Sequence, residues 1–323
     1  MLTIQCRRGR STRTLEATLR YYQPSKIPLD ARSGGWAGSA ASFLALSGPV
    51  GSLELRRALM GLDLVAEAPL VHRSGVDRRY CWDLTFSAPK SISILWAAAR
   101  SDLRKEIEQT HLEATALTLS IIESTYPLGR RGRNGTKKEF VMVLAAIFPH
   151  FLSREGDPQI HAHVLLMNLA RYPDNRWGGL DPKMIYRDQK HLGGLYRQTL
   201  AKRLERRGFP VRLTAETLRV EGISSEMEEA FSRRHVEIVK KKRSLGRTGG
   251  PISMMAALST RPEKRWHSIE ELEAGWRTRL KAFGITAEFV EGVRKRATGA
   301  EMASIESEIP ESVPDPSFLS GGM

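Results

Sequence analysis

The sequence predicts an α+β fold, in which an antiparallel β-sheet forms a palm with flanking helices. Segments rich in Val, Ile, Leu and Phe, with the pattern of strands, are interspersed with segments that have the periodicity of amphipathic helices. Two of the strand segments follow each other across a short turn, which predicts an antiparallel hairpin. The chain has 323 residues, 41% of them hydrophobic, enough for one large domain or two smaller ones.

The elements that precede the hairpin mix strands with helices. We expect a short strand at 2–7, a helix containing "TLEATLRYYQ" (14–23), and a short helix near 53–61 after a Gly/Ser-rich stretch at 33–51. The β-forming segment "RYCWDLTFSAP" (79–89) predicts a strand. Two helices should follow, one over 91–99 and one over the amphipathic segment 104–125.

The elements after the hairpin are mainly helical. A helix at 186–208 should end at Gly208 and Pro210, and "VRLTAETLRVEG" (211–222) alternates like a pair of strands. Three further helices are expected at about 225–243, 268–281 and 286–297. We therefore expect a unit containing the sheet over 1–225, a helical unit over 226–299, and an acidic, Pro- and Ser-rich segment over 300–323 that is a disordered tail or a linker.

The charge of the chain indicates a polyanionic partner. The net charge is +14, and no uncharged apolar run approaches the length of a membrane span. Nucleic acid therefore fits better than a membrane surface, because no basic amphipathic anchor with exposed aromatic residues is visible. Two cysteines, Cys6 and Cys81, are too few for a disulfide framework and suit a reducing cytoplasm. The sequence contains no Walker-type phosphate loop.

Three of the eight histidines lie within "HFLSREGDPQIHAHVLLMN" (150–168). A hairpin centred near Gly156 places His150 opposite the neighbourhood of His161 and His163, and these two project from one face because they are two residues apart. Three imidazole nitrogens that converge in this way predict a divalent metal site with open positions. The alternative for an isolated H-x-H pair is a solvated strand face, but the third histidine across the turn favours a metal.

The adjacent Tyr21 and Tyr22 lie at the end of a predicted helix. One ring could pack in the core while the other faces solvent; the functional interpretation is a phenol nucleophile that forms a phosphotyrosine. Because a phenol has a pKa near 10, it needs a base or a cation to activate it. Asp83 is a candidate for that base or for orienting a histidine. Lys90 follows closely and could hold a phosphate.

Together, "YY", "DLTFSAPKS" (83–91) and "SREGDPQIHAHVLLMN" (153–168) resemble the MobF class of conjugative relaxases, the TrwC/TraI type, within the HUH endonucleases. The resemblance covers residues 1 to about 295 and implies the relaxase fold, with an antiparallel palm over 1–225 and helical fingers over 226–299. It implies that Tyr21, with Tyr22 beside it, attacks single-stranded DNA, that Asp83 takes the proton, and that the histidines bind Mg, Mn or Zn. DNA contacts are expected from Lys90, Arg154, Gln189 and Arg197.

The resemblance also implies partners and a location. The partner is single-stranded transfer-origin DNA with an adjacent hairpin, together with a coupling protein, the secretion machinery and an accessory nicking protein, with no membrane insertion. The expected location is the bacterial cytoplasm, with transfer to the recipient. One departure is the absence of a second tyrosine pair after Tyr22. The alternatives are a rolling-circle replication initiator, which more often carries its tyrosine after the histidines, and a non-catalytic DNA-binding module with a structural metal.

Overall fold

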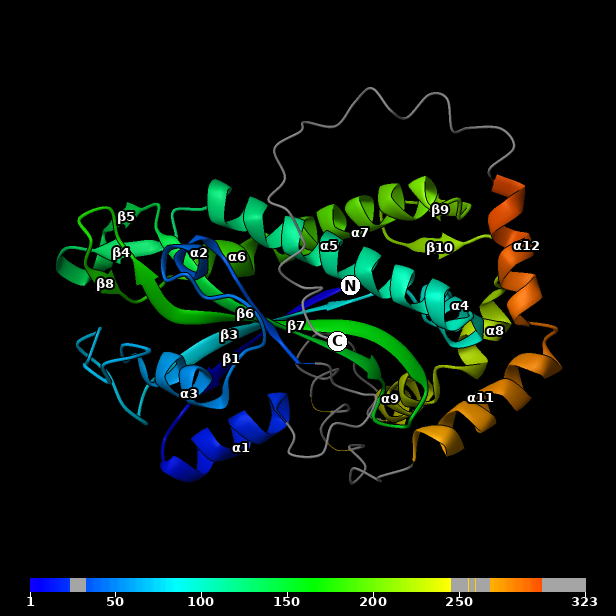
Figure 1. The fold of residues 1–323 in the computed structure, drawn as a ribbon, viewed down its shortest axis with the longest axis horizontal. Helices are drawn as coiled ribbons and strands as arrows, with labels where there is room; N and C mark the ends of the chain where they lie inside the picture. The colour runs from blue at the N-terminus through cyan, green and yellow to red at the C-terminus, as the bar shows by residue number, and fades with distance from the viewer. Residues whose placement is uncertain (24–32, 245–254, 256–258, 260–267, 298–323) are drawn as a thin grey trace.

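An antiparallel sheet forms the centre of the computed structural model, which describes residues 1–23, 33–244 and 268–297, together with Met255 and Ser259. The strand order is β1-β3-β7-β6-β2 (Figure 1). These strands are β1 (Leu2–Arg8), β2 (Gly35–Ala37), β3 (Arg79–Ser87), β6 (Met142–Leu152) and β7 (Pro158–Arg171), and β8 (Trp177–Gly178) pairs with β7. The predicted fold class, an antiparallel palm with flanking helices, is confirmed.

Helices cover both faces of this sheet (Figure 1). One face packs against α4 (Lys90–Ala98), α5 (Ser101–Thr125) and α7 (Gln189–Arg206), and the other against α1 (Thr12–Tyr22), α2 (Ser39–Phe43) and α3 (Ser52–Met60). Because successive strand residues point to opposite faces, Leu84 and Phe86 of β3 enter the first core while Asp83 and Thr85 point to the side of α1. The polar side chains of β3 therefore lie on the face that carries α1.

Helix α1 is placed by its cap and by its apolar spacing. Ser11 caps the helix by accepting a hydrogen bond from the backbone N–H of Thr14. Leu15, Leu19 and Tyr22 are buried at spacings of four and three residues, so they form one stripe against the sheet. Tyr21, one residue before the end of this stripe, projects from a different side of the helix.

The hairpin β6–β7 has the register that its turn dictates. His150 pairs with His161, and Phe148 pairs with His163. The five-residue connection between the strands contains Gly156 at φ 71°, a left-handed conformation that favours glycine. The predicted convergence of the three histidines across this hairpin is therefore present.

The C-terminal helices pack at the end of the sheet where this turn lies (Figure 1). They are α8 (Ser225–Ala230), α9 (Arg233–Ser244), α11 (Ile269–Ala282) and α12 (Ala287–Ala297). Trp276 and Leu280 of α11 and Val290 of α12 belong to the same core as α4 and α5. The proposed fingers thus share the core of the palm, and the predicted boundary at 225 remains a prediction.

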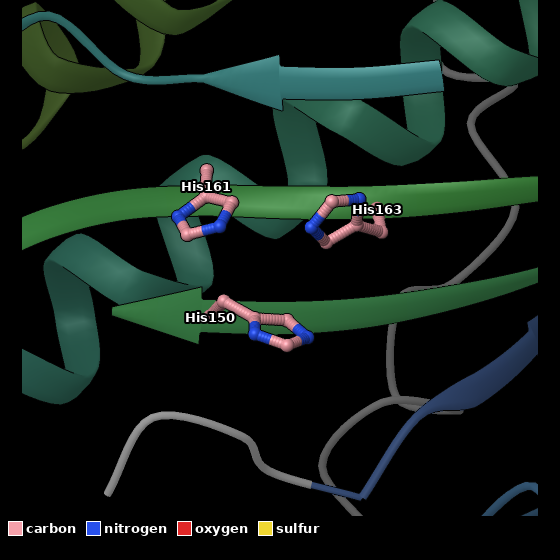
Figure 2. A group of neighbouring side chains, drawn as sticks. All are labelled: His150, His161 and His163. Atoms are coloured by element: carbon pink, nitrogen blue, oxygen red, sulfur yellow. The ribbon is translucent and has the colours of Figure 1, made fainter. Parts of the chain in front are cut away.

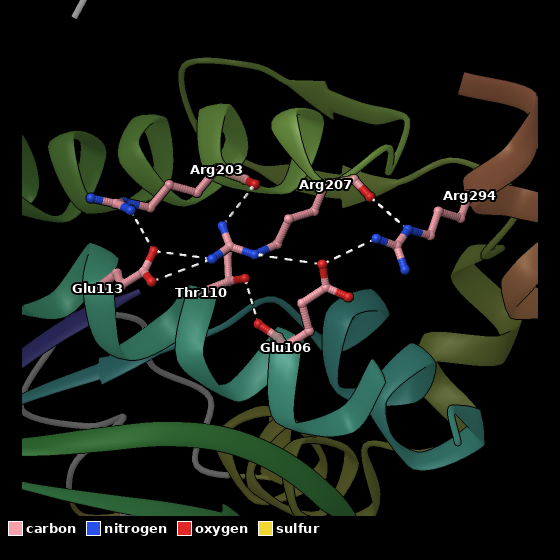
Figure 3. Close-up of polar contacts among 6 residues, drawn as sticks. All are labelled: Glu106, Thr110, Glu113, Arg203, Arg207 and Arg294. Carbon is pink, nitrogen blue, oxygen red and sulfur yellow. Dashed lines mark hydrogen bonds and ion pairs between the residues drawn. The ribbon is translucent and has the colours of Figure 1, made fainter. Parts of the chain in front are cut away.

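A network of ion pairs ties α12 to the helical layer over the sheet (Figure 3). Arg207, which follows α7, pairs with Glu106 and Glu113 of α5. Glu113 also accepts from Arg203, and Glu106 accepts from Arg294 of α12 at 3.1 Å. Because these groups are partly exposed, their ion pairs add little to the stability of the fold. Their main effect is to align the three segments with one another.

Several short elements complete the fold. The basic segment at 129–139 forms the strand pair β4 (Gly129–Arg131) and β5 (Lys137–Glu139) around the 3₁₀ turn Arg133–Gly135. The short helix α6 (Lys183–Arg187) precedes α7, and β9 (Val211–Leu213) pairs with β10 (Leu218–Val220) as expected. Among the described residues, no helix has the length and apolar character to cross a membrane. The predicted disordered tail at 300–323 lies outside the described residues.

Candidate active site

The three histidines predicted to bind a metal converge on one face of the hairpin (Figure 2). Their ring centroids are 5.0–5.3 Å apart, and each ring offers a nitrogen within 4.8 Å of the other two. Histidine nitrogens bind Zn²⁺ at about 2.1 Å, so two nitrogens on one ion lie no more than about 4.2 Å apart. Small ring rotations of His150, His161 and His163 are therefore enough to bring all three onto one ion.

Two of these rings already have partners that orient them for a metal. Nδ1 of His163 lies 2.8 Å from a carboxylate oxygen of Asp83, and Nδ1 of His161 lies 2.9 Å from the backbone oxygen of Gln159. If each Nδ1 carries the proton that is donated, each Nε2 presents its lone pair, as in metal sites of proteins. Burial, followed by the charge of His163, lowers the pKa of His161 to about 4, so this ring is neutral at pH 7. The donor set thus fits a divalent ion.

Tyr21 and Tyr22 are placed differently. The hydroxyl of Tyr21 lies 3.4 Å from Nε2 of His163, and the side chain is 39% exposed within the cleft. Tyr22 is only 2% exposed and donates a hydrogen bond of 2.7 Å to Asp83. Burial and the Asp83 charge raise the pKa of Tyr22 well above its usual range, which makes its phenolate inaccessible. Of the two hydroxyls, that of Tyr21 is the one accessible from the cleft.

Asp83 is surrounded by partners that keep it ionised. One carboxylate oxygen accepts from His163 and from Thr85, and the other accepts from Arg7 and Tyr22. Burial opposes ionisation, but the charges of His163 and Arg7 outweigh it and hold the pKa of Asp83 below its usual range. In this structure the tyrosine that bonds to Asp83 is Tyr22, because α1 turns the side chain of Tyr22 toward β3; the transfer of the Tyr21 proton to Asp83 remains a prediction.

Arg7 is a functional candidate that the sequence did not reveal. Its guanidinium donates to Asp83 at 2.5 Å and lies 5.5 Å from the ring centroid of Tyr21 and 5.8 Å from that of Tyr22. The signal would have been the alternation of β1, because Arg7 projects to the same face as Thr3 and Gln5, which line the cleft. The pairing of β1 with β3, however, joins residues far apart in the sequence, and no local pattern predicts its register.

A cleft of about 1300 Å³ contains this site and most of the expected DNA-binding residues. Lys90, Arg154 and Arg197 line it, as do the tyrosines, Asp83 and the histidines. Lys90 also donates to the backbone oxygen of Pro158 at 2.9 Å, and Arg197 donates to that of Ala215. Gln189 is not among the lining residues: its amide donates to the backbone oxygen of Leu2 and joins α7 to β1, so its contact with bases remains a prediction.

Fold and site together define a class of protein: an antiparallel palm with three convergent histidines beside a tyrosine is the arrangement of a metal-dependent DNA-nicking enzyme. Residues 6–283 match the family model of the TrwC relaxase, and the chain belongs to this family. It is also 28% identical, over 269 residues, to the multifunctional conjugation protein TraI of Escherichia coli K12. That match covers 77% of this chain but only 14% of TraI.

Solved structures agree with this assignment. The metal-bound structure of the conjugative relaxase TrwC in complex with oriT DNA superposes with a TM-score of 0.78 at 27% identity, over 89% of this chain and 100% of TrwC. A TrwC complex with a 27-mer that comprises the recognition hairpin and the cleavage site gives 0.76 at 26% identity, over the same shares of the two chains. These findings support a relaxase with a divalent metal ion and do not favour the replication initiator or the non-catalytic module.

Proposed function

We propose that this chain is a site- and strand-specific transesterase that nicks single-stranded transfer-origin DNA. The hydroxyl oxygen of Tyr21 attacks the scissile phosphate and the P–O3′ bond breaks; Tyr21 loses its proton to solvent, directly or through Asp83, and the leaving O3′ takes one up from solvent, so no net proton is released. The products are a 5′-phosphotyrosyl enzyme and a free 3′-hydroxyl, and the reverse reaction rejoins the strand. The observation that carries the proposal is the position of Tyr21, whose hydroxyl faces the histidine cluster inside the cleft.

The residues around Tyr21 have separable roles in this proposal. His150, His161 and His163 would hold the ion, which supplies charge neutralisation at a non-bridging phosphate oxygen when bound. Asp83 holds His163 in orientation through Nδ1, and the hydroxyl of Tyr21 lies on the Nε2 side of the same ring, where the ion would be held. Tyr22 and Arg7 hold the second oxygen of Asp83. Tyr22 is thus a support for the site, and its catalytic role would be limited to a later strand transfer.

The family also supports proposals about partners. By analogy with the TrwC complex, the substrate carries a hairpin beside the cleavage site. The helices after 225 would close over the strand as fingers. Lys90, Arg154 and Arg197 are placed to contact it in the cleft. A coupling protein, the secretion machinery and an accessory nicking protein would act with the chain, which would work in the bacterial cytoplasm and be transferred with the DNA to the recipient.

The test is covalent capture of DNA on Tyr21. Single-stranded oligonucleotides tiled across the transfer origin of the encoding element, labelled at the 3′ end, are incubated with the protein and Mg²⁺ or Mn²⁺. A denaturing gel should show a labelled protein adduct for the unmodified chain and for Tyr22→Phe. Tyr21→Phe should form none, while its affinity for the oligonucleotide persists. An adduct at the original rate with Tyr21→Phe would reassign the nucleophile.

A further inference from the structure

The turn of the histidine hairpin contains a carboxylate that the proposed chemistry does not use. Asp157 is fully buried, at 0% exposure, and lies four residues before His161. Its oxygens accept hydrogen bonds from the backbone N–H and Nε of Arg233, both at 3.0 Å, and from Nη1 of Arg279 at 2.9 Å. Arg233 is the first residue of α9 and Arg279 belongs to α11, so two helices distant in sequence converge on one side chain.

The backbone of the same turn is held by the same two helices. Trp276 of α11 donates its indole N–H to the backbone oxygen of Gly156 at 2.8 Å, and Arg233 donates to that of Glu155 at 2.5 Å. Within the turn, the backbone N–H of Ser153 donates to the backbone oxygen of Asp157 at 2.8 Å. The turn therefore has little freedom to move unless α9 and α11 move with it.

Every residue between Asp157 and His161 is also anchored. Pro158 accepts from Lys90, the amide of Gln159 donates to the backbone oxygen of Ala88, and the backbone N–H of Ile160 donates to Ser93. The backbone oxygen of Gln159 is in turn the partner of Nδ1 of His161. Asp157 and the ring that would bind the metal thus lie at the two ends of one short segment whose every residue is hydrogen-bonded.

Stability alone does not account for this arrangement. A buried carboxylate with two arginines loses its hydration, and well-packed apolar residues in such places often stabilise a fold equally well. What a charged, multiply hydrogen-bonded group supplies is a defined position. Here that position relates the histidine hairpin to two helices, and α9 also supplies Arg234 and His235 to the lining of the cleft.

We propose that Asp157 is a positioning residue that couples the docking of α9 and α11 to the geometry of the three-histidine site. The site binds its metal tightly when these helices are docked and loosely when they are released. A strand in the cleft that contacts α9 would then tighten metal binding, and the metal would tighten the strand to the same degree. The inference rests on the metal site of the proposed function, and it adds that the docking of α9 and α11 controls the affinity of that site for its metal.

The experiment measures the metal site directly, without nicking activity. The whole chain is titrated with Co²⁺, whose visible absorption reports both its affinity and the geometry of its imidazole ligands. The variants are Asp157→Asn, which keeps the shape of the side chain, and Arg279→Gln, which removes one partner. The control is Glu273→Gln, which removes the ion pair of α11 with Arg104 but does not touch the turn.

Asp157→Asn should lower the affinity for Co²⁺ about tenfold or more and change the absorption spectrum, as loss of a group that orients ligands does. Arg279→Gln, which leaves Arg233 in place, should have a smaller effect in the same direction and serves alone if Asp157→Asn does not fold. Glu273→Gln should bind Co²⁺ like the unmodified chain. A 20-nucleotide oligothymidylate should raise the Co²⁺ affinity of the unmodified chain more than that of Asp157→Asn.

Three outcomes would overturn the inference. Unchanged Co²⁺ affinity and spectrum in folded Asp157→Asn, or in folded Arg279→Gln where Asp157→Asn does not fold, would leave the proposed metal site intact and remove the coupling. Equal losses in Asp157→Asn and Glu273→Gln would mean that the fold has loosened in general. Failure of the unmodified chain to bind Co²⁺ would reject the metal site, and the coupling with it.

Discussion

Tyr21 and Tyr22 are chemically identical residues whose environments assign them different tasks. One peptide unit rotates a side chain by about 100° around a helix. Because of that rotation, the Tyr22 hydroxyl donates a hydrogen bond to buried Asp83, whereas the Tyr21 hydroxyl lies next to His163 of the histidine cluster. A buried phenol beside a carboxylate loses its acidity, whereas an exposed phenol in the cleft can meet a phosphate.

Arg7 should matter to the reaction because its guanidinium lies near both tyrosine rings and bonds to Asp83. Arg7→Met removes the charge with little loss of volume, so the rate of adduct formation at saturating oligonucleotide should fall about 10- to 100-fold. Arg7→Lys, which keeps the charge but not the planar fork, should recover part of the rate. Single-turnover kinetics measure this, and a Met variant with the original rate would refute the role.

Lys90 should make DNA binding depend on pH. Burial, aided by the charge of Arg279 and opposed by that of Asp157, lowers the pKa of Lys90 from 10.5 to about 8. The side chain is therefore charged below pH 8 and loses its charge as the pH rises through that value. Affinity for single-stranded DNA should fall a few-fold (about one lost phosphate contact) between pH 7 and 9. Fluorescence anisotropy checks this.

The control is Lys90→Arg, whose guanidinium stays charged throughout, so its affinity should be flat over the same range. Stability should have the opposite trend in the unmodified chain. Between about pH 8 and 10.5 the unfolded chain retains the proton that folded Lys90 has released, so the free energy of unfolding contributed by Lys90 rises with pH. Equal pH profiles for DNA binding by the two proteins would remove Lys90 from the interface.

The site was predictable from sequence to the extent that its parts are local. His150, His161 and His163 could be placed because a turn and an alternation of two residues fix a hairpin. Arg7 and Asp157 could not be recognised, because their partners lie at 83, 233 and 279 and no local pattern encodes those contacts. The hydrogen bond between Tyr22 and Asp83 could not be foreseen for the same reason, because the rotation of α1 depends on tertiary packing.

At the scale of elements, the long helices and strands were predictable; of the short strands, the pair β9–β10 was predicted, but β2 and the pair β4–β5 were not. Helix α5 and the hairpin β6–β7 have enough periodic positions to establish their type. Strand β2 has three residues, Gly35 to Ala37, too few for an alternation, and only its pairing with β6 makes it a strand. The pair β4–β5 is equally short.

The packing of α5 on α7 contains a buried histidine that should make the fold sensitive to acid. Nδ1 of His111 lies 2.7 Å from the hydroxyl of Tyr196, and both side chains are buried. Burial, with the charge of His161, lowers the pKa of His111 to about 3. Between pH 6.5 and 3 the unfolded chain binds a proton that the folded chain does not, so stability falls as the pH falls through this window.

The expected slope from His111 is about 1.4 kcal/mol per pH unit below 6.5. His111→Gln, which can still bond to Tyr196 but does not titrate, should lose less stability than the unmodified chain between pH 7 and 5. Urea unfolding at the two pH values measures the difference, and the contribution of His161 cancels because both proteins contain it. Identical losses would show that His111 is not the group that takes up the proton.

At the scale of the whole molecule, the net charge of +14 can contribute phosphate contacts near the site only through the cations that line the cleft. Lys90, Arg154, Arg197, Arg219 and Arg234 line the cleft. Other cations are paired elsewhere: Lys138 with Asp181, Arg131 with Asp174, and Arg207 with two glutamates of α5. The expectation of a nucleic-acid partner therefore follows from the placement of charge, which composition alone could suggest but not locate.

Salt dependence should separate these two groups of cations. Each phosphate neutralised on a single strand contributes about −0.7 to the slope of log affinity against log salt. Arg154→Ala should flatten that slope by about 0.7 or less, because Arg154 lines the cleft. Lys138→Ala should leave the slope unchanged, because Lys138 lies outside the cleft and is paired with Asp181. Affinities are measured by anisotropy at several salt concentrations.

The same measurement decides whether Arg197 reads sequence. With a transfer-origin oligonucleotide and a scrambled one of equal composition, loss of a base contact should reduce the discrimination between them by about 1–3 kcal/mol. Loss of a phosphate contact should weaken both equally and flatten the slope for both. The guanidinium of Arg197 donates to the backbone oxygen of Ala215, and we expect a base contact because the resemblance to the relaxases implies one at this position. Equal weakening of both oligonucleotides would instead assign Arg197 to the phosphate backbone.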